Sequence, residues 1–306
     1  MRKQVKLPFF GKKKDSASGM AEIAKESMRQ EQKFLIWSND DFFLREAYKA
    51  TRTNVMFSLA GSEGCQVVAV TSSLQSEGKS ITICNLAMSL VDVGKSVLVI
   101  DCDLRRPKIN RLLNVAAKVG VTDVLLDKNK TNDALVRLKE NKELWVMAAG
   151  RIPPNPSELL ASQAMKNLVQ RMREQFDFIL IDTPPIGMVT DALVLSPLVD
   201  GFLFVVKANQ SNRNAVTHAV EQLEYANAKI LGLIFNGTNQ GGGGYGYKKY
   251  GYKKYGYRGY SRYGYYGRGY GYGGGYGYGY GYGYGYQSMP EQPEPAQVKP
   301  QGEEKQ

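Results

Sequence analysis

The sequence predicts a doubly wound α/β fold with a mostly parallel sheet, and two observations carry the prediction. Short apolar runs rich in β-branched residues alternate with stretches of helical character, as in a sheet covered on both faces. Polar side chains follow several of these runs directly, where parallel strands collect ligands. The runs are residues 67–70, 97–100, 144–147, 178–181, 202–206 and 230–235.

The loop after the first run, TSSLQSEGKS at residues 71–80, is the stretch around which the rest of the chain is organised. A strand, a polar loop, Gly-Lys-Ser and then a helix over residues 81–90 is the order of a phosphate-binding P-loop. Gly78 permits close backbone approach, Lys79 would reach the β- and γ-phosphates, and the Ser80 hydroxyl would ligate Mg²⁺. The sequence therefore predicts a nucleotide site at this loop.

The predicted nucleotide-binding set includes one residue far away in the sequence. The usual pattern begins with Gly six residues before the Lys, where this chain has Ser73. Asn236 ends the last apolar run, and its amide suits either an adenine edge or an ordinary turn. The set is Ser73, Leu74, Gln75, Ser76, Glu77, Gly78, Lys79, Ser80, Ile81 and Asn236.

Three aspartates end two other apolar runs and are candidates for metal binding or proton transfer. Asp101 and Asp103 stand two residues apart, so on an extended segment their side chains face the same way. A helix-capping aspartate beside a solvated one fits the same spacing. Asp182 follows residues 178–181, a pattern typical of a carboxylate that holds Mg²⁺ through water.

Charge and composition divide the chain into three regions. Of the net charge of +11, residues 1–14 contribute six basic side chains and residues 241–286 seven, with no acids in either stretch. The last twenty residues add two basic side chains and four Glu, which leaves 25 of each sign in residues 15–240. Because the expected folded body is neutral, a nucleic-acid role for it is disfavoured. We expect a basic mobile leader at 1–38 and a globular domain at 39–240.

Residues 241–306 are expected to form a disordered tail. Eighteen of the 20 tyrosines lie between residues 245 and 286, mostly alternating with Gly and interspersed with Lys and Arg. Such a stretch has no aliphatic partners with which to build a core. Elsewhere, three scattered cysteines suit core positions in a reducing compartment, and no apolar run approaches the roughly 18 residues of a membrane span. We therefore expect a soluble, cytoplasmic protein.

Two helix starts can be placed from capping residues. Asp40 or Asp41 would cap a helix over residues 42–60, and Asn155 with Pro156 would start another. In the first of these helices Glu46, Lys49 and Arg52 recur every three residues. The spacing fits an intrahelical ion pair or a charged stripe that docks on another subunit.

Together these segments resemble the bacterial tyrosine kinases, especially the soluble capsule-synthesis kinases of Gram-positive bacteria. The resemblance spans residues 40–240, and a tyrosine-rich tail is also a trait of that family. It implies that ATP and Mg²⁺ bind to this chain, with Asp101 favoured over Asp103 as the base for the tyrosine hydroxyl. The segments that carry it are TSSLQSEGKS, VLVIDCDLRRP, AAGRIPPNPSELL and FILIDTPP. The implied catalytic residues are Lys79, Asp101, Asp103 and Asp182, and the implied metal ligands are Ser80, Asp103 and Asp182.

The resemblance also implies a function: autophosphorylation of the tail in trans within a homo-oligomer, regulating capsular or exopolysaccharide synthesis and export. It implies a membrane polysaccharide co-polymerase that recruits the chain to the inner face of the plasma membrane, its cytoplasmic tail completing the nucleotide site. A tyrosine phosphatase is expected as a further partner, and nucleic acid is not. The expected phosphorylation sites are Tyr245, Tyr247, Tyr250, Tyr252, Tyr255, Tyr257, Tyr260, Tyr263, Tyr265, Tyr266, Tyr270, Tyr272, Tyr276, Tyr278, Tyr280, Tyr282, Tyr284 and Tyr286.

This chain departs from that family at two places. The family's Glu-x-x-Arg-x-x-Arg oligomerisation motif appears as Glu46, Lys49 and Arg52, with Lys replacing the middle Arg and losing its planar fork. The match nevertheless favours the docking stripe. Gln75 and Ser76 stand where the family often has Pro and Gly.

Two other functions compete with the kinase. A ParA/MinD-like positioning ATPase would have the same sheet, but that class carries a second Lys five residues before the P-loop Lys, where this chain has Leu74. An RNA or condensate binder could use the tail, with Tyr and Arg stacking on bases. Leu74 and the tyrosine-rich tail disfavour the positioning ATPase, and the neutral core with its complete set of nucleotide motifs disfavours the RNA binder.

Overall fold

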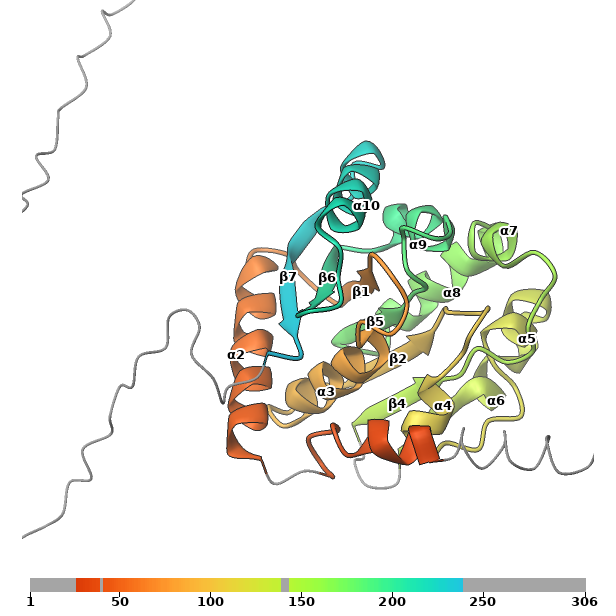
Figure 1. Ribbon diagram of the computed structural model, residues 1–306. Helices are drawn as coiled ribbons and strands as arrows, with labels where there is room; N and C mark the ends of the chain where they lie inside the picture. The colour runs from red at the N-terminus through yellow and green to blue at the C-terminus, as the bar shows by residue number, and fades with distance from the viewer. Residues whose placement is uncertain (1–25, 39–40, 139–142, 239–306) are drawn as a thin grey trace, which may run out of the picture. The chain divides into compact units, whose positions relative to one another are not determined.

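The computed structural model describes residues 26–38, 41–138 and 143–238 (Figure 1). Every described residue belongs to the first of the two units into which the chain divides, Met1–Gly244 and Tyr245–Gln306. The predicted tail at 241–306, with its tyrosine cluster, lies outside the described residues and stays a prediction. Within the described part, no helix has the length and apolarity that crossing a membrane requires.

Within these residues the protein forms one seven-stranded sheet in the order β3-β4-β2-β5-β1-β6-β7 (Figure 1). All neighbouring strands pair in parallel except β3 and β4, which are antiparallel. The predicted fold class and all six predicted strands are confirmed, and the short edge strand β3 was not predicted. The strands are β1 (Gln66–Ser72), β2 (Val97–Asp101), β3 (Leu135–Arg137), β4 (Leu144–Met147), β5 (Phe178–Asp182), β6 (Gly201–Lys207) and β7 (Ile230–Asn236).

Helices cover both faces of the sheet and form two separate cores. Alternate residues of β1 point to opposite faces, so Val67 and Ala69 join one core while Val68 and Val70 join the other. Helices α5, α8, α9 and α10 pack on the first face, and α2, α3 and α4 on the second. The helices are α2 (Phe42–Ser58), α3 (Lys79–Val91), α4 (Ile109–Leu112), α5 (Val121–Leu126), α6 (Thr131–Ala134), α7 (Pro156–Leu160), α8 (Gln163–Arg173), α9 (Asp191–Val194) and α10 (Arg213–Tyr225), with 3₁₀ turns η1 (Lys128–Lys130) and η2 (Ser196–Leu198).

Both predicted helix starts are confirmed, but of the two predicted capping side chains only Asp41 bonds to the helix backbone. Asp41 caps α2, because its Oδ1 accepts hydrogen bonds from the backbone N–H groups of Phe43 (2.8 Å) and Leu44 (3.4 Å). Asn155 stands at the start of α7, and its Nδ2 donates to Glu158 Oε2 at 2.6 Å. The local sequence thus fixes where both helices begin.

Residues 26–38, which we call the N-terminal strap, correct the expectation of a mobile leader over 1–38. Residues 26–32 are helical, and Leu35 and Ile36 are buried in the same core as α3. Asn85 of α3 holds the strap by accepting a bond from Ile36 N and donating one to the Phe34 carbonyl, both at 2.9 Å. The apolar run at 34–37 is short and has no sequence period. The burial of Leu35 and Ile36 depends on packing against α3, so the local sequence could not predict it.

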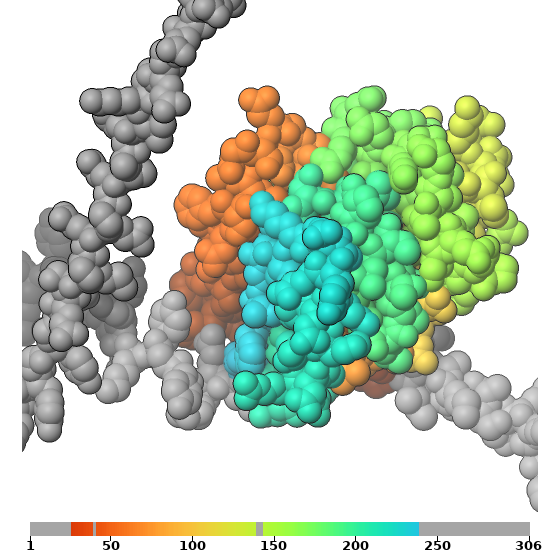
Figure 2. All heavy atoms as spheres, turned by 90° about the horizontal axis from the view of Figure 1, so that it is seen from above, coloured from red at the N-terminus to blue at the C-terminus, as the bar shows by residue number. Residues whose placement is uncertain are grey.

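The edge of the sheet at β7 lies beside α2. Lys229 Nζ donates to the Ser58 carbonyl at 3.2 Å, and Ser58 Oγ donates to the Leu231 carbonyl at 3.4 Å. Figure 2 shows β7 and α10, in blue and cyan, on the near face with the orange helix α2 alongside. Phe235 of β7 and Phe57 of α2 are both exposed on the surface.

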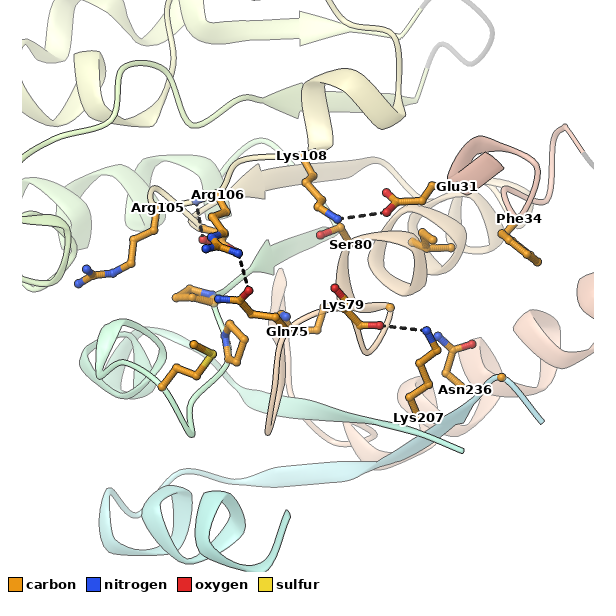
Figure 3. Close-up of a pocket in the computed structure, with 18 of the residues that line it drawn as sticks. Glu31, Phe34, Gln75, Lys79, Ser80, Arg105, Arg106, Lys108, Lys207 and Asn236 are labelled. Atoms are coloured by element: carbon orange, nitrogen blue, oxygen red, sulfur yellow. Dashed lines mark hydrogen bonds and ion pairs between the residues drawn. The ribbon is translucent and has the colours of Figure 1, made fainter. Parts of the chain in front are cut away.

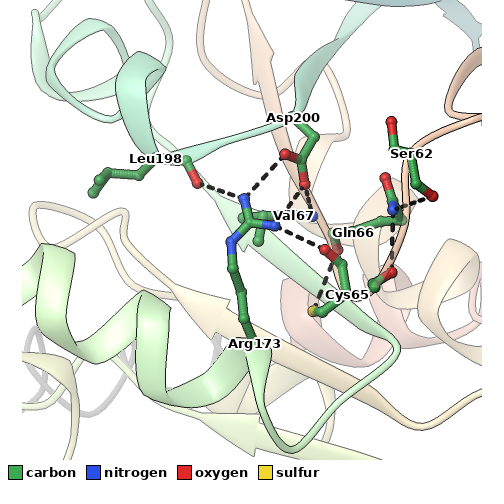
Figure 4. Close-up of polar contacts among 8 residues, drawn as sticks. Ser62, Cys65, Gln66, Val67, Arg173, Leu198 and Asp200 are labelled. Carbon is green, nitrogen blue, oxygen red and sulfur yellow. Dashed lines mark hydrogen bonds and ion pairs between the residues drawn. The ribbon is translucent and has the colours of Figure 1, made fainter.

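The amino end of the sheet is fixed by an arginine at the end of α8 (Figure 4). Arg173 donates to the Cys65 carbonyl at 2.7 Å and to both carboxylate oxygens of Asp200 at 3.0 and 3.1 Å. Asp200 in turn accepts from Val67 N at 2.6 Å. This network ties the start of β1 to the residue before β6 and leaves the carboxyl ends of the strands for the site.

The three cysteines are buried free thiols, as the composition predicted. Burial raises the pKa of Cys65 to about 11, and burial likewise raises the pKa values of Cys84 and Cys102. The thiols are therefore neutral core side chains at physiological pH.

Candidate active site

The turn into α3 is built around a glycine in a backbone conformation that strains any other residue. Gly78 has φ +98°, and a Cβ added there would lie 2.0 Å from Asn236 Nδ2. The same Asn236 nitrogen donates to the Glu77 carbonyl at 3.0 Å. The end of β7 thus fixes the start of α3, whose free N–H groups and dipole favour an anion.

Glu77 holds the loop together from behind. Its buried carboxylate accepts hydrogen bonds from Ser73 Oγ (2.9 Å), from Leu74 N (2.7 Å) and from Ser211 Oγ. Ser73, Leu74 and Glu77 do not line the pocket, although all three belong to the predicted nucleotide-binding set. Their place in the structure is to shape the loop from the side away from the pocket.

The remaining residues of the predicted set border one cavity of about 450 Å³ at the carboxyl ends of the strands (Figure 3). That volume lies within the usual range for small-molecule sites. These residues are Gln75, Ser76, Gly78, Lys79, Ser80, Ile81 and Asn236. The structure therefore brings together seven of the ten predicted residues around the opening.

Ser80 and Asp182 form a direct contact beside this cavity. Ser80 Oγ donates to Asp182 Oδ2 at 2.6 Å, while the buried Oδ1 of Asp182 has no hydrogen-bond partner among the described residues. Burial raises the pKa of Asp182 to about 7, against the lowering effects of the Lys79 charge and the Ser80 hydrogen bond. A hydroxyl beside a carboxylate with a spare oxygen fits Mg²⁺, which prefers oxygen ligands.

The metal would need further ligands from elsewhere. Among the described residues, no group of three or more His, Cys, Asp or Glu side chains is placed to hold an ion. Mg²⁺ commonly binds through one or two carboxylates together with substrate phosphates and water. The Ser80–Asp182 pair therefore suits a metal that arrives with a nucleotide.

The two aspartates after β2 occupy different environments. Asp101 is fully buried and accepts three backbone N–H bonds, from Asp103 at 3.2 Å and from Lys108 and Ile109 at 3.1 Å each. Burial first, and then the nearby charge of Asp182, raises the pKa of Asp101. Asp103 borders the cavity, and its Oδ1 accepts from Arg106 N at 3.0 Å. Asp101 thus shapes the loop, whereas Asp103 faces the opening.

Lys79 lies largely buried among carboxylates. Burial lowers the pKa of its ammonium group, while Asp182, Asp103 and Glu77 act in the opposite direction. A cation held in this way is placed to contact a polyanionic ligand.

Four further cations border the cavity that sequence reasoning left unassigned. Arg106 Nη1 donates to Gln75 Oε1 at 2.5 Å, and Lys207 Nζ donates to the Ser76 carbonyl at 3.1 Å. The set is Arg105, Arg106, Lys108 and Lys207. Three of them closely follow Asp103 in the sequence, and this position could have marked them as candidate site residues. For Lys207, the only sequence feature that could have marked it is its position at the end of a predicted strand.

Arg105 connects the cavity to a buried carboxylate on α9. Its Nε and Nη2 donate to the two oxygens of Asp191 at 2.9 and 3.0 Å, and Ser157 Oγ donates to Asp191 Oδ1 at 2.5 Å. The Asp191 hydrogen bond and charge raise the pKa of Arg105. This network fixes the loop after β2 against α7 and α9.

The predicted oligomerisation residues lie on α2, outside the residues that line the cavity. Lys49 Nζ and Glu46 Oε1 form an intrahelical pair at 2.7 Å, which fits the simpler of the two interpretations of their spacing. Arg52 instead donates to the Ser89 carbonyl of α3 at 2.6 Å. The three residues therefore do not act as one unit within the chain.

The chain is similar in sequence to one protein family and to several known proteins. Residues 65–256 match the protein family described as "ParA: NUBPL iron-transfer P-loop NTPase". The tyrosine-protein kinase YwqD of Bacillus subtilis is 38% identical over 192 residues, which cover 63% of this chain and 80% of that protein. The tyrosine-protein kinase CpsD of Streptococcus agalactiae is 36% identical over 202 residues, covering 66% and 86%.

Solved structures give the same grouping. The kinase domain of the Escherichia coli tyrosine kinase ETK superposes with a TM-score of 0.62 at 29% identity, covering 67% of this chain and 80% of that one. The chimerical protein CapA2B2 gives a TM-score of 0.58 at 32% identity, covering 61% and 82%.

Proposed function

The chain belongs to the bacterial tyrosine-protein kinases, within the ParA-type P-loop NTPases, and on this premise we propose that it transfers the γ-phosphoryl group of ATP to tyrosines of its own C-terminal region. The observation that supports this most is the Ser80–Asp182 hydrogen bond of 2.6 Å beside a cavity that Lys79 and Asp103 also border. Phosphoryl transfer requires a phosphate cradle, a metal site and a proton acceptor at one place.

Binding of the nucleotide falls to the loop and the start of α3. The backbone N–H groups there and the ammonium group of Lys79 hold the phosphates. Ser80 and Asp182 hold Mg²⁺, which neutralises charge on the phosphates when bound. Glu77 keeps the loop in shape through its three hydrogen-bond donors.

The proton acceptor is Asp103. A free tyrosine has a pKa of about 10, so its hydroxyl attacks at neutral pH only if its proton is removed as the bond to phosphorus forms. The proton passes to the Asp103 carboxylate, the phenol oxygen bonds to the γ-phosphorus, and ADP leaves. We assign this role to Asp103 over the expected Asp101, because the oxygens of Asp101 are occupied by three backbone N–H groups.

The phosphorylated tyrosines are those between residues 245 and 286, which lie outside the described residues. Glycine beside tyrosine allows each hydroxyl to enter the cavity of a neighbouring subunit. Each phosphate adds about −1.5 to −2 charges, so about four would cancel the seven basic side chains of residues 241–286. We propose that this charge reversal loosens the homo-oligomer and thereby regulates synthesis and export of a capsular or extracellular polysaccharide.

A membrane polysaccharide co-polymerase is the proposed partner that recruits the chain to the inner face of the plasma membrane. One relative is named the succinoglycan biosynthesis transport protein ExoP of Rhizobium meliloti, 35% identical over 184 residues that cover 59% of this chain and 23% of that protein. The kinase-like region of that relative is thus part of a longer protein named for polysaccharide transport. A tyrosine phosphatase would reverse the tail modification.

The iron-transfer activity in the family description is not supported by the residues of this chain. Cys65, Cys84 and Cys102 are buried, with pKa values raised by burial, so they present no thiolate to an iron cargo.

The sequence also disfavours a positioning ATPase. Leu74 stands where that class would carry its second lysine, and the Leu74 backbone N–H donates to Glu77.

A labelling experiment tests the proposal. The pure protein is incubated with Mg²⁺ and γ-labelled ATP, with and without a peptide from the partner's cytoplasmic tail. Label on tail tyrosines of the wild type, absent from Lys79→Met, supports the kinase. Release of free phosphate with no labelled protein would instead support an ATPase.

A further inference from the structure

The cavity has two chemically different ends. Arg105 and Arg106 border one end, while Phe34 borders the other, beyond Ser80 (Figure 3). Asp103 also borders the cavity and accepts a hydrogen bond from Arg106 N at 3.0 Å, so it lies beside Arg106. Leu44, Tyr48 and Ile81 also border the cavity, so it has an apolar lining besides the cations. The charged end suits phosphates and the acceptor hydroxyl, and the apolar lining suits a flat organic ring.

Phe34 reaches the cavity because the N-terminal strap is fastened on both sides of it. On one side Asn85 bonds to Ile36 N and to the Phe34 carbonyl, both at 2.9 Å. On the other, Glu31 pairs with Lys108 Nζ at 3.2 Å. Gln32 Nε2 donates to the Arg111 and Leu112 carbonyls at 2.9 and 3.2 Å. The strap is thus held between α3 and α4 with Phe34 in its middle.

The side chain of Phe34 is exposed, although the strap that carries it is anchored on both sides. Its neighbour Leu35 is fully buried, yet Phe34 itself is 58% exposed at the edge of the cavity. A large apolar ring left open beside a nucleotide-sized opening offers a stacking surface, and base–aromatic stacking is a strong, geometrically tolerant contact.

The direction of the nucleotide follows from the reacting end. The γ-phosphate must face Asp103, because the acceptor hydroxyl gives its proton there. With the phosphate chain at Lys79 and Ser80, the base then extends away from Asp103, toward Phe34. Asn236 borders the same cavity, and its Nδ2 donates to the Glu77 carbonyl at 3.0 Å.

We propose that the N-terminal strap is part of the nucleotide site and that the ring of Phe34 stacks on the adenine base of ATP. This inference rests on the proposed function, since it assumes that ATP occupies the cavity. It assigns to this chain's own residues 26–38 a share of the nucleotide affinity that does not depend on a partner protein.

The test compares two probes that share a triphosphate and differ in the base. Binding of MgATP and of magnesium tripolyphosphate to the full-length chain is measured by calorimetry. Phe34→Ala should weaken MgATP binding roughly 5- to 150-fold and leave tripolyphosphate binding within about twofold, because only the stacking contact is removed. Phe34→Tyr, which keeps a ring, should restore MgATP binding.

Phe57→Ala is the matched control, since Phe57 is another exposed phenylalanine, on α2, that does not border the cavity. It should change neither affinity. Gln32→Ala loosens one anchor of the strap without touching the cavity, and should weaken MgATP selectively but by less than Phe34→Ala.

Two results would overturn the inference. One is unchanged MgATP affinity in Phe34→Ala, and the other is an equal loss for both probes, which would mean damage to the fold. Lys79→Met separates this from the proposed function, because it should weaken both probes in the wild-type background. If Lys79→Met had no effect on either probe, the nucleotide site itself would be misassigned.

Discussion

Ser80 Oγ and Asp182 Oδ2 lie 2.6 Å apart although 102 residues separate them in the sequence. The parallel pairing of β1 with β5, which sets Val70 opposite Asp182, brings the end of β5 level with the loop that leads into α3. The contact is therefore a direct consequence of strand order and register. It places a hydroxyl and a carboxylate where a metal bound to phosphates would sit.

Asp182→Asn should abolish most phosphoryl transfer. The amide keeps the size of the side chain but loses the charge that holds the metal, so we expect a rate loss of roughly 100-fold or more and a higher Mg²⁺ concentration for half-maximal rate. Labelling rates measured across a Mg²⁺ titration check this. Asp92→Asn, on the surface at the end of α3, is the control and should behave as wild type. Normal rates at ordinary Mg²⁺ in Asp182→Asn would contradict the assignment.

Asp101→Asn and Asp103→Asn should fail in different ways. Asp103→Asn should lose phosphoryl transfer while keeping ATP affinity and melting temperature, because its carboxylate accepts the proton at the edge of the cavity. Asp101→Asn should lower the stability by about 1–3 kcal/mol, because an amide NH₂ cannot accept the backbone bonds that the buried carboxylate accepts.

Calorimetry alongside labelling distinguishes these two variants. A stable but inactive Asp101→Asn together with an active Asp103→Asn would show that Asp101 is the proton acceptor and would reverse our assignment.

The depressed pKa of Asp177 predicts how stability depends on pH. The Ser96 backbone N–H, donating at 2.8 Å, is the main cause of the lower pKa, and the Ser96 hydroxyl adds to it. A carboxyl whose folded pKa is depressed stabilises the protein above its unfolded pKa of about 3.9 and stops doing so as the pH falls through the folded value.

Asp177→Asn should therefore melt at a lower temperature than wild type near pH 7. The gap should be a few degrees at most, because the side chain is 45% exposed and its ion pair with Lys95 is screened. It should narrow as the pH drops below about 4. Thermal melts across pH check this, and a gap that widened in acid would refute the stabilising role of the ionised Asp177 carboxylate.

The α2 residues allow a test of oligomerisation separate from stability. Glu46 and Lys49 pair on the surface, so Glu46→Ala with Lys49→Ala should reduce the particle size in light scattering without changing the melting temperature. Arg52→Ala should lower the melting temperature as well, because its bond to the Ser89 carbonyl fastens α2 to α3. An unchanged particle size in the double variant would remove this surface from the interface.

The sequence predicted the features that depend on neighbouring residues and missed those that depend on residues far apart in the chain. The six strands, the Asp41 cap and the helix start at Asn155 follow from runs of a few residues, and the structure has them where the pattern predicts them. The strand β3 is three residues long in a polar stretch, so no local period marks it. The burial of the N-terminal strap depends on Asn85, about fifty residues further along, and escapes a local pattern for the same reason.

Seven of the ten residues predicted for the nucleotide site border the cavity, but the different roles of the predicted residues could not be read from the sequence. The loop pattern predicts a nucleotide contact at Glu77, yet its carboxylate turns to Ser211, 134 residues away. Asp101 and Asp103 are indistinguishable by spacing. They are distinguished by the backbone of Lys108 and Ile109, which folds back onto only one of them.

The measurement that tests the central claim most directly is mass spectrometry of a mixed reaction. Wild-type protein is incubated with MgATP and an isotopically heavy, full-length Lys79→Met chain. We predict phosphotyrosine within residues 245–286 of the heavy chain, because a subunit with an intact site would modify the tail of one without. Consumption of ATP with no phosphotyrosine on either chain would contradict the account.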